Sequence, residues 1–203
     1  SIDLSTFQKE KKIGSGNFGK VYRAIEKETN DVYAAKISIF EMNSCPENII
    51  IDLCREVDIM SKLKHQAILN YIGYSPFNFK NKPKPVIMTE FASCGSLQEI
   101  LEKERNYLGD HSWNDTKKLI NIYGIASGMA YIHKHHILHR DLKPANILLD
   151  EFLYPKIADF GLSKDIFDES NNGDNHIISG FKGTYCYSAP EIVFSYYYST
   201  AGD

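Results

Sequence analysis

The sequence predicts an α+β fold of two lobes, with an antiparallel sheet first and mainly helices afterwards. Strand-like runs separated by turn residues dominate residues 7–39, whereas helical patterns dominate after residue 97. Between the two parts lies the small-residue segment 92–96 (ASCGS), which is typical of a linker. We therefore expect one lobe over residues 1–91 and a second over residues 92–203.

Five strands and one helix are expected in the first lobe. The strand-like runs are residues 7–13, 20–26, 32–37, 68–74 and 85–91. Antiparallel hairpins connect the first three most simply. Ser44 and Pro46 can start a helix, and apolar residues from Ile50 to Leu63 recur mostly at spacings of three and four. This spacing predicts a helix with one apolar face.

The second lobe is expected to begin with helices at 97–104 and 115–134. They are followed by the polar stretch 139–146 (HRDLKPAN) and then by the apolar run 147–149. The polar side chains of 139–146 are too closely spaced for one helix face and too polar for a strand. The stretch therefore predicts a catalytic loop held between buried elements.

Four polar side chains in and after this loop supply what phosphoryl transfer requires. Asp141 can accept a proton, and Lys143 can meet phosphate charge. Asn146 and Asp159 offer oxygen atoms to a hard cation.

A glycine-rich turn, formed by Gly14, Gly16 and Gly19, lies between the first two predicted strands. Glycines in such a turn let backbone N–H groups approach phosphate closely. The same spacing opens dinucleotide-binding folds, but there the third glycine begins a helix, whereas here the strand-like run 20–25 follows. A nucleotide-dependent oxidoreductase with a parallel sheet is therefore the weaker alternative.

Lys36 stands in the apolar run 32–39, where an unpaired charge is expensive. It is either a surface lysine on an edge strand or a lysine that reaches nucleotide phosphates beside a carboxylate. Glu56 is the preferred partner because it lies in the middle of the predicted helix. Glu47, near the helix start, is explained by the helix dipole alone.

The order of these motifs resembles that of eukaryotic-type protein kinases. The matching segments are the glycine-rich turn with Val21, residues 33–36 (YAAK), Glu56, residues 139–146, residues 159–161 (DFG) and residues 189–191 (APE). The resemblance runs from about residue 7 to the end of the chain. It implies a bilobal protein-kinase-like fold that uses ATP and Mg²⁺ and has a protein substrate.

The resemblance also implies a role for each matching residue. Lys36 would hold the α- and β-phosphates and pair with Glu56. Asp141 would orient the attacking hydroxyl, and Lys143 would face the γ-phosphate. Asn146 and Asp159 would bind Mg²⁺. The other ATP-binding positions are Ile13, Gly14, Gly16, Gly19, Val21, Ala34, Thr89, Glu90, Ala92 and Leu148. The apolar positions among them also suit an ordinary core.

Substrate class and regulation follow from the same resemblance. Lys143 and Thr184 match the Ser/Thr kinases, and residues 95–97 (GSL) resemble the tyrosine-kinase-like branch. Arg140 resembles the arginine that captures a phosphate added to the activation loop. Ser179 and Thr184 are the candidate regulatory phosphosites, although Ser179 is equally explained as a solvated loop serine.

Several classes of protein are disfavoured by composition. A net charge of −3 gives no electrostatic case for nucleic acid or a membrane surface, and no segment reaches the roughly 18 apolar residues of a membrane span. The four cysteines form no CxxC pair, which is typical of reduced thiols in a cytoplasmic protein. The sequence predicts no oligomeric state.

The chain ends on residues 201–203 (AGD), where the kinase family opens a buried helix. We therefore expect a fragment of a longer kinase, with uncovered apolar faces at 115–134 and 147–149 and little activity of its own. A kinase-fold binding or scaffold module without catalysis is the other alternative. Intact Lys36 and Asp141 argue against it.

Overall fold

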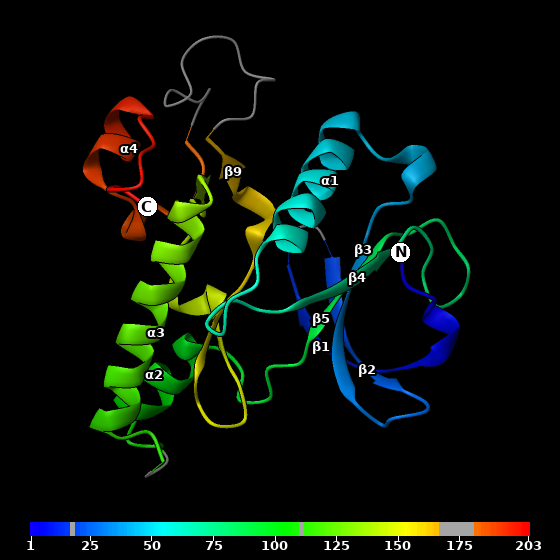
Figure 1. The fold of residues 1–203 in the computed structure, drawn as a ribbon, viewed down its shortest axis with the longest axis horizontal. Coiled ribbons are helices and arrows are strands. Elements are labelled where there is room, and N and C mark those ends of the chain that lie inside the picture. The colour runs from blue at the N-terminus through cyan, green and yellow to red at the C-terminus, as the bar shows by residue number, and fades with distance from the viewer. Residues whose placement is uncertain (17–18, 110–111, 167–180) are drawn as a thin grey trace. The chain divides into compact units, whose positions relative to one another are not determined.

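The computed structural model describes residues 1–16, 19–109, 112–166 and 181–203 (Figure 1). The chain forms two compact units. The first unit consists of Ser1–Ser61 and Asn70–Ala92, and the second consists of Lys62–Leu69 and Ser93–Asp203. Among the described residues, no helix is both long and apolar enough to cross a membrane.

A five-stranded sheet forms the body of the first unit. Its strands are β1 (Phe7–Ser15), β2 (Gly19–Glu26), β3 (Val32–Ser38), β4 (Tyr71–Ser75) and β5 (Val86–Glu90). The order is β1-β2-β3-β5-β4, and every neighbouring pair is antiparallel. The predicted antiparallel sheet is confirmed, and the parallel sheet of the oxidoreductase alternative is wrong.

The fourth strand begins at Tyr71 and not at Ile68, as the apolar run had predicted. Ile68 forms a parallel bridge with Ile157, and the Leu69 N–H donates to the Ile157 carbonyl at 2.9 Å. Both residues therefore belong to the second unit, where they add backbone pairing to the strand that contains Ile157.

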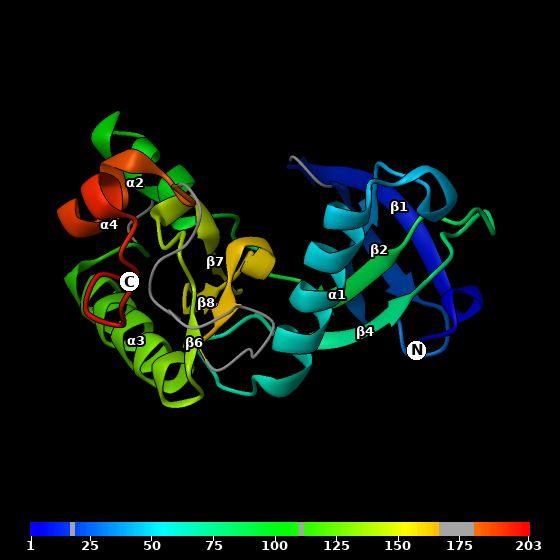
Figure 2. The same ribbon diagram turned by 90° about the horizontal axis from the view of Figure 1, so that it is seen from above.

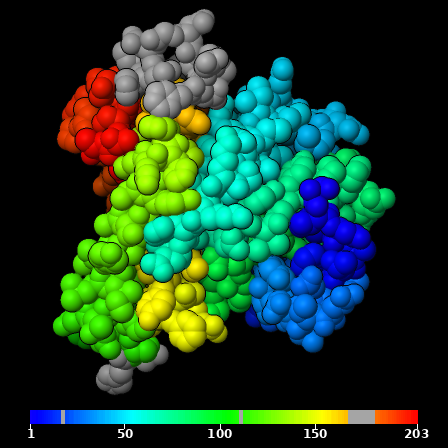
Figure 3. Space-filling view, viewed as in Figure 1, coloured from blue at the N-terminus to red at the C-terminus, as the bar shows by residue number. Residues whose placement is uncertain are grey.

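One face of the sheet packs on the N-terminal segment. Buried Leu4 and Phe7 join Ala24, Ala35, Val86 and Met88 in one apolar cluster. The backbone N–H of Ile2 donates to the Tyr74 carbonyl at 2.9 Å, so the first residues are hydrogen-bonded to β4. Figure 3 shows the first residues in dark blue on the surface of this unit.

The other face carries α1 (Glu47–Lys62), the helix predicted from the apolar spacing. It buries Glu56, Ile59 and Met60, and Figure 2 shows it beside the strands of the first unit. Glu47 in its first turn and Lys62 in its last turn both suit the helix dipole.

The second unit combines helices with two short antiparallel strand pairs. Its helices are α2 (Leu97–Arg105), α3 (Asp115–Lys134) and α4 (Pro190–Ser195), and its strands are β6 (Ile137–Leu138), β7 (Ile147–Leu149), β8 (Pro155–Ile157) and β9 (Lys164–Asp165). β6 pairs with β9 and β7 pairs with β8, both antiparallel. A capping box of Ser96 and Glu99 starts α2.

The expected uncovered faces are only half confirmed. On α3, Leu119, Ile122 and Tyr123 are exposed by 67%, 66% and 73%. Ile147 and Leu149 are buried, however, so the expectation for β7 is wrong. The reason is local, because β7 pairs with β8 and Leu149 packs in a cluster with Trp113 and Leu153.

Candidate functional site

In the first unit, the strand register gathers the expected nucleotide-binding residues on one face of the sheet. Val21 lies opposite Lys36, and Ala34 lies opposite Thr89. Directly opposed residues share a face, and so do residues two apart on one strand. Ala34 and Lys36 therefore point to the same side, away from the apolar cluster that contains Ala35.

Lys36 forms an ion pair with Glu56, the partner that the sequence analysis ranked first. Its Nζ lies 2.5 Å from Glu56 Oε1, and the Glu56 side chain is only 6% exposed. The Lys36 side chain is 25% exposed. A nearly buried carboxylate needs such a partner, because an unpaired charge at this depth is costly. The pair holds the ammonium group beside the sheet face of Val21 and Ala34.

The glycine-rich turn joins β1 and β2. A Cβ on Gly19 would lie 2.8 Å from the Ile37 carbonyl oxygen, so the close approach of β3 requires glycine at this position. Gly16 donates its N–H to the Gly19 carbonyl at 2.9 Å, and Gly14 lies opposite Val21. Residues 17–18, between them, are outside the described part of the chain.

The remaining positions that were expected to bind nucleotide lie on separate elements. Ile13 is on β1 and 40% exposed, while Thr89 and Glu90 end β5 and Ala92 follows them. In the second unit, Leu148 lies on β7 and forms a bridge with Ser96.

The loop 139–146 is held at both ends by the strand pairs of the second unit. It follows β6 and leads into β7. The His139 Nε2 lies 3.0 Å from the Ala158 carbonyl, and the Ala158 N–H donates to the Asn146 carbonyl at 2.9 Å. Residue 158 is thereby fixed to the loop from two sides, which places Asp159 directly beside this anchor.

The Asp141 carboxylate is the centre of a polar cluster in this loop. Its Oδ2 accepts from Asn146 Nδ2 at 2.9 Å and lies 2.8 Å from Lys143 Nζ. Its Oδ1 accepts from the Thr184 hydroxyl at 2.6 Å. Lys143 Nζ also donates to Thr184 Oγ1 at 2.8 Å. The second unit thus brings Asp141, Lys143 and Asn146 together, with Thr184 as a fourth member.

Two residues beside the cluster have left-handed backbones. Arg140 has φ 65° and Asp159 also has φ 65°. Such conformations cost free energy in residues other than glycine and persist where surrounding contacts enforce them. At Asp159 the next residue, Phe160, is 1% exposed and its ring packs edge-on against His139 at 5.1 Å. This packing holds the turn that carries the Asp159 carboxylate.

Asp203 supports Arg140, a role that the sequence analysis did not assign. Its Oδ1 accepts from the Arg140 N–H at 2.6 Å, and its Oδ2 accepts from the His139 N–H at 2.7 Å. Oδ2 also lies 2.9 Å from His133 Nε2. Burial alone raises the pKa of Asp203, but these hydrogen bonds outweigh it and leave the pKa below its ordinary value.

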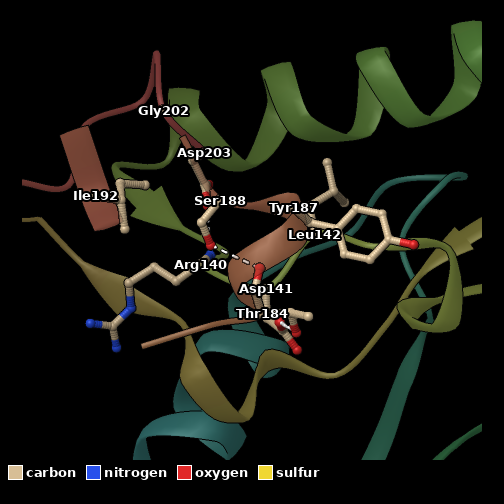
Figure 4. Close-up of a pocket in the computed structure, with 9 residues that line it drawn as sticks. All are labelled: Arg140, Asp141, Leu142, Thr184, Tyr187, Ser188, Ile192, Gly202 and Asp203. Carbon is tan, nitrogen blue, oxygen red and sulfur yellow. Dashed lines mark hydrogen bonds between the residues drawn. The ribbon is translucent and has the colours of Figure 1, made fainter. Parts of the chain in front are cut away.

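A small pocket adjoins Asp141 in the second unit. Thr184, Tyr187 and Asp203 are among its lining residues (Figure 4). The figure shows Asp141 and Thr184 close together and the Arg140 side chain extending away from them. The Thr184 hydroxyl thus occupies the side of Asp141 that carries Oδ1.

The two expected phosphosites have different outcomes. Ser179 lies outside the described residues. Thr184 is within them, and its hydroxyl is engaged by Asp141 and Lys143. Phosphorylation of Thr184 stays a prediction, and a phosphate there would displace both contacts.

Comparison with known proteins identifies the class. The protein kinase domain family matches residues 7–203 of this chain. With that match, the antiparallel sheet and the Asp141 loop, the chain belongs to the protein kinase domain family.

Individual relatives agree with this class. The human NUAK family SNF1-like kinase 1 is 35% identical over 187 residues, covering 92% of this chain and 26% of that protein. The serine/threonine-protein kinase fused of Drosophila melanogaster is 32% identical over 181 residues, covering 89% of this chain and 20% of that protein. The serine/threonine-protein kinase STY17 of Arabidopsis thaliana is 30% identical over 193 residues, covering 95% of this chain and 30% of that protein. The chain thus spans less than a third of the length of these relatives.

Proposed function

We propose that the protein transfers the γ-phosphate of Mg-ATP to a serine or threonine hydroxyl of a protein substrate. The observation that carries this proposal is the polar cluster around Asp141. One oxygen of the carboxylate contacts Lys143 and Asn146, and the other accepts a hydrogen bond from a threonine hydroxyl. This arrangement suits a carboxylate that accepts a hydrogen bond from an alcohol. The hydrogen bond from the Thr184 hydroxyl to Oδ1 supports an alcohol as the group that this atom accepts.

Each of these residues has a distinct task in the proposed reaction. Asp141 orients the acceptor hydroxyl and accepts its proton. Lys143, at 2.8 Å from Asp141, balances negative charge on the transferred phosphate. In the first unit, Lys36 binds the α- and β-phosphates, and Glu56 keeps its ammonium group in place.

The donor set of the second unit suits Mg²⁺. Asn146 uses its amide nitrogen for the Asp141 backbone carbonyl and carboxylate, at 2.8 and 2.9 Å. Its two printed hydrogen bonds both use the amide nitrogen, so the amide oxygen can be offered to a hard cation. The carboxylate of exposed Asp159 is the second oxygen donor that we propose for the cation. When bound, Mg²⁺ would neutralise charge on the phosphates.

The Asp141→Asn variant tests the proposal. Asparagine keeps the size of the side chain but accepts no proton, so we expect phosphate transfer to a mixed Ser/Thr peptide substrate to fall by at least about 100-fold. The control is Asp115→Asn, because the Asp115 side chain is 98% exposed. The melting temperatures of both variants are measured to establish that both are folded in the assay. Equal transfer by Asp141→Asn and the unaltered protein would reject the proposed role of Asp141.

The same experiment separates catalysis from a scaffold role. A kinase-fold scaffold would bind nucleotide, or a partner, without transfer by either protein. Ser/Thr preference is measured with matched peptides in which serine, threonine or tyrosine is the only acceptor. We propose a cytoplasmic location, which microscopy of the tagged protein tests.

A further inference from the structure

A buried tyrosine near the chain end contacts both segments that carry the Asp141 cluster. Tyr198 is 1% exposed and packs with Leu138 and Ile192 in one apolar cluster. Leu138 directly precedes the loop of Asp141. The Tyr198 ring therefore packs against the residue that leads into that loop.

The Tyr198 hydroxyl holds the backbone of Lys182 from two directions. It accepts from the Lys182 N–H at 2.6 Å and donates to the Lys182 carbonyl at 2.8 Å. In an extended chain, the N–H and the carbonyl of one residue point to the same side. The Tyr198 hydroxyl therefore makes the two backbone hydrogen bonds that a neighbouring strand would make at Lys182. Phenylalanine has no hydroxyl and could make neither of them.

Lys182 is joined to Thr184 by a single, tightly packed residue. Gly183 has φ 118°, and a Cβ at this position would lie 2.5 Å from the Arg140 carbonyl oxygen. The chain thus passes against the backbone of Arg140 just before it delivers the Thr184 hydroxyl to Asp141. A side chain at position 183 would collide with the Arg140 carbonyl, and the anchor at Lys182 lies only two residues before Thr184.

Tyr198 contacts the other segment as well. The guanidinium carbon of Arg140 lies 5.7 Å from the centre of the Tyr198 ring, within the range of a cation–π contact. Arg140 directly precedes Asp141. A single side chain therefore contacts a residue beside Asp141 and a residue two positions from Thr184.

We propose that Tyr198 is a positioning residue for phosphoryl transfer, through its hydroxyl bonds to Lys182 and its ring contact with Arg140. This inference rests on the proposed function of Asp141. Tyr198 touches no reacting atom. It fixes the distance between the Asp141 carboxylate and the Thr184 hydroxyl.

The test is Tyr198→Phe, which keeps the buried ring and removes only the hydroxyl. We expect kcat to fall about tenfold with an unchanged KM for ATP, because the substitution leaves Lys36 and the rest of the first unit unaltered. The matched control is Tyr196→Phe, since Tyr196 is 42% exposed and packs outside this cluster. Hydrogen exchange measures the anchor itself, and we expect faster exchange at the Lys182 amide with unchanged exchange at Leu138.

The outcomes separate this inference from the proposed function. Full activity of Tyr198→Phe beside an inactive Asp141→Asn overturns the inference and leaves the proposed function standing. If Asp141→Asn keeps full activity, the proposed function fails, and hydrogen exchange still decides whether Tyr198 anchors Lys182. If Tyr198→Phe melts below the assay temperature, kcat of this variant is measured at a lower temperature at which it stays folded, beside Tyr196→Phe. Unchanged kcat in Tyr198→Phe at that temperature also overturns the inference.

Discussion

The Asp203 carboxylate accepts a 2.6 Å hydrogen bond from the backbone N–H of Arg140, although 63 positions separate the two residues. Arg140 has a left-handed backbone that its own side chain disfavours. The bond therefore stabilises a strained position directly before Asp141.

Replacement of Asp203 tests this support. In Asp203→Ala, the N–H groups of His139 and Arg140 lose their acceptor, which costs about 2–4 kcal/mol of the free energy of unfolding. We expect kcat to fall more than the affinity for ATP. Urea unfolding and steady-state kinetics measure the two effects, with Asp115→Ala as the exposed control. A variant with normal stability and normal kcat would contradict the support role.

The pH dependence of stability follows from the same carboxylate. The fold lowers the pKa of Asp203, so the folded protein binds fewer protons there than the unfolded chain. Its stabilisation is fully present above the unfolded pKa of about 3.9 and is lost as pH falls through the lower folded pKa. We expect the difference in melting temperature between the protein and Asp203→Asn to shrink below pH 4. A difference independent of pH would count against this assignment.

Variants of the Lys36–Glu56 pair are expected to change stability and phosphate transfer differently. Lys36→Met leaves the nearly buried Glu56 carboxylate unpaired, which we expect to cost about 2 kcal/mol, discounted for the partial exposure of Lys36. The double variant Lys36→Met/Glu56→Leu removes both charges and should recover most of that stability. Transfer should remain lost in both.

Denaturant unfolding and a kinase assay check this pair of expectations. Lys20→Met serves as the control, because Lys20 is exposed on β2. If the double variant is no more stable than Lys36→Met, the unpaired Glu56 is not the source of the loss.

Thr184 predicts a difference between two conservative variants. Thr184→Ser keeps the hydroxyl that donates to Asp141 and accepts from Lys143, whereas Thr184→Val keeps only the shape. We expect near-normal transfer by the serine variant and about a tenfold to hundredfold lower kcat for the valine variant. Peptide kinetics at saturating ATP measure this. Equal kcat values would show that the hydroxyl is dispensable.

The fold could be predicted from sequence wherever periodic patterns are local. The apolar spacing after Pro46 predicted α1, and the strand-like runs predicted the antiparallel sheet. The short pairs β6–β9 and β7–β8 were missed, because strands of two or three residues carry no readable alternation. Their existence depends on partners distant in sequence.

The site was predictable to the extent that its side chains lie close together in the chain. Asp141, Lys143 and Asn146 fall within one short loop, so their proximity could be predicted from the sequence. The structural roles of Tyr198 and Asp203 depend on contacts with Lys182 and Arg140 that no spacing encodes. The residue types alone, a tyrosine and an aspartate in residues 198–203, do not indicate these contacts.

The stretch between α1 and β4 gives the molecule an interlaced connectivity. The backbone carbonyl of Ala67 accepts from Ile157 at 2.7 Å, so residues 62–69 belong to the second unit although residues on both sides belong to the first. A protease cut near Ala92 would therefore leave the two halves still linked through this stretch. A piece consisting of residues 1–92 would carry Ala67 and Ile68 without the strand that shields them, and we expect it to aggregate.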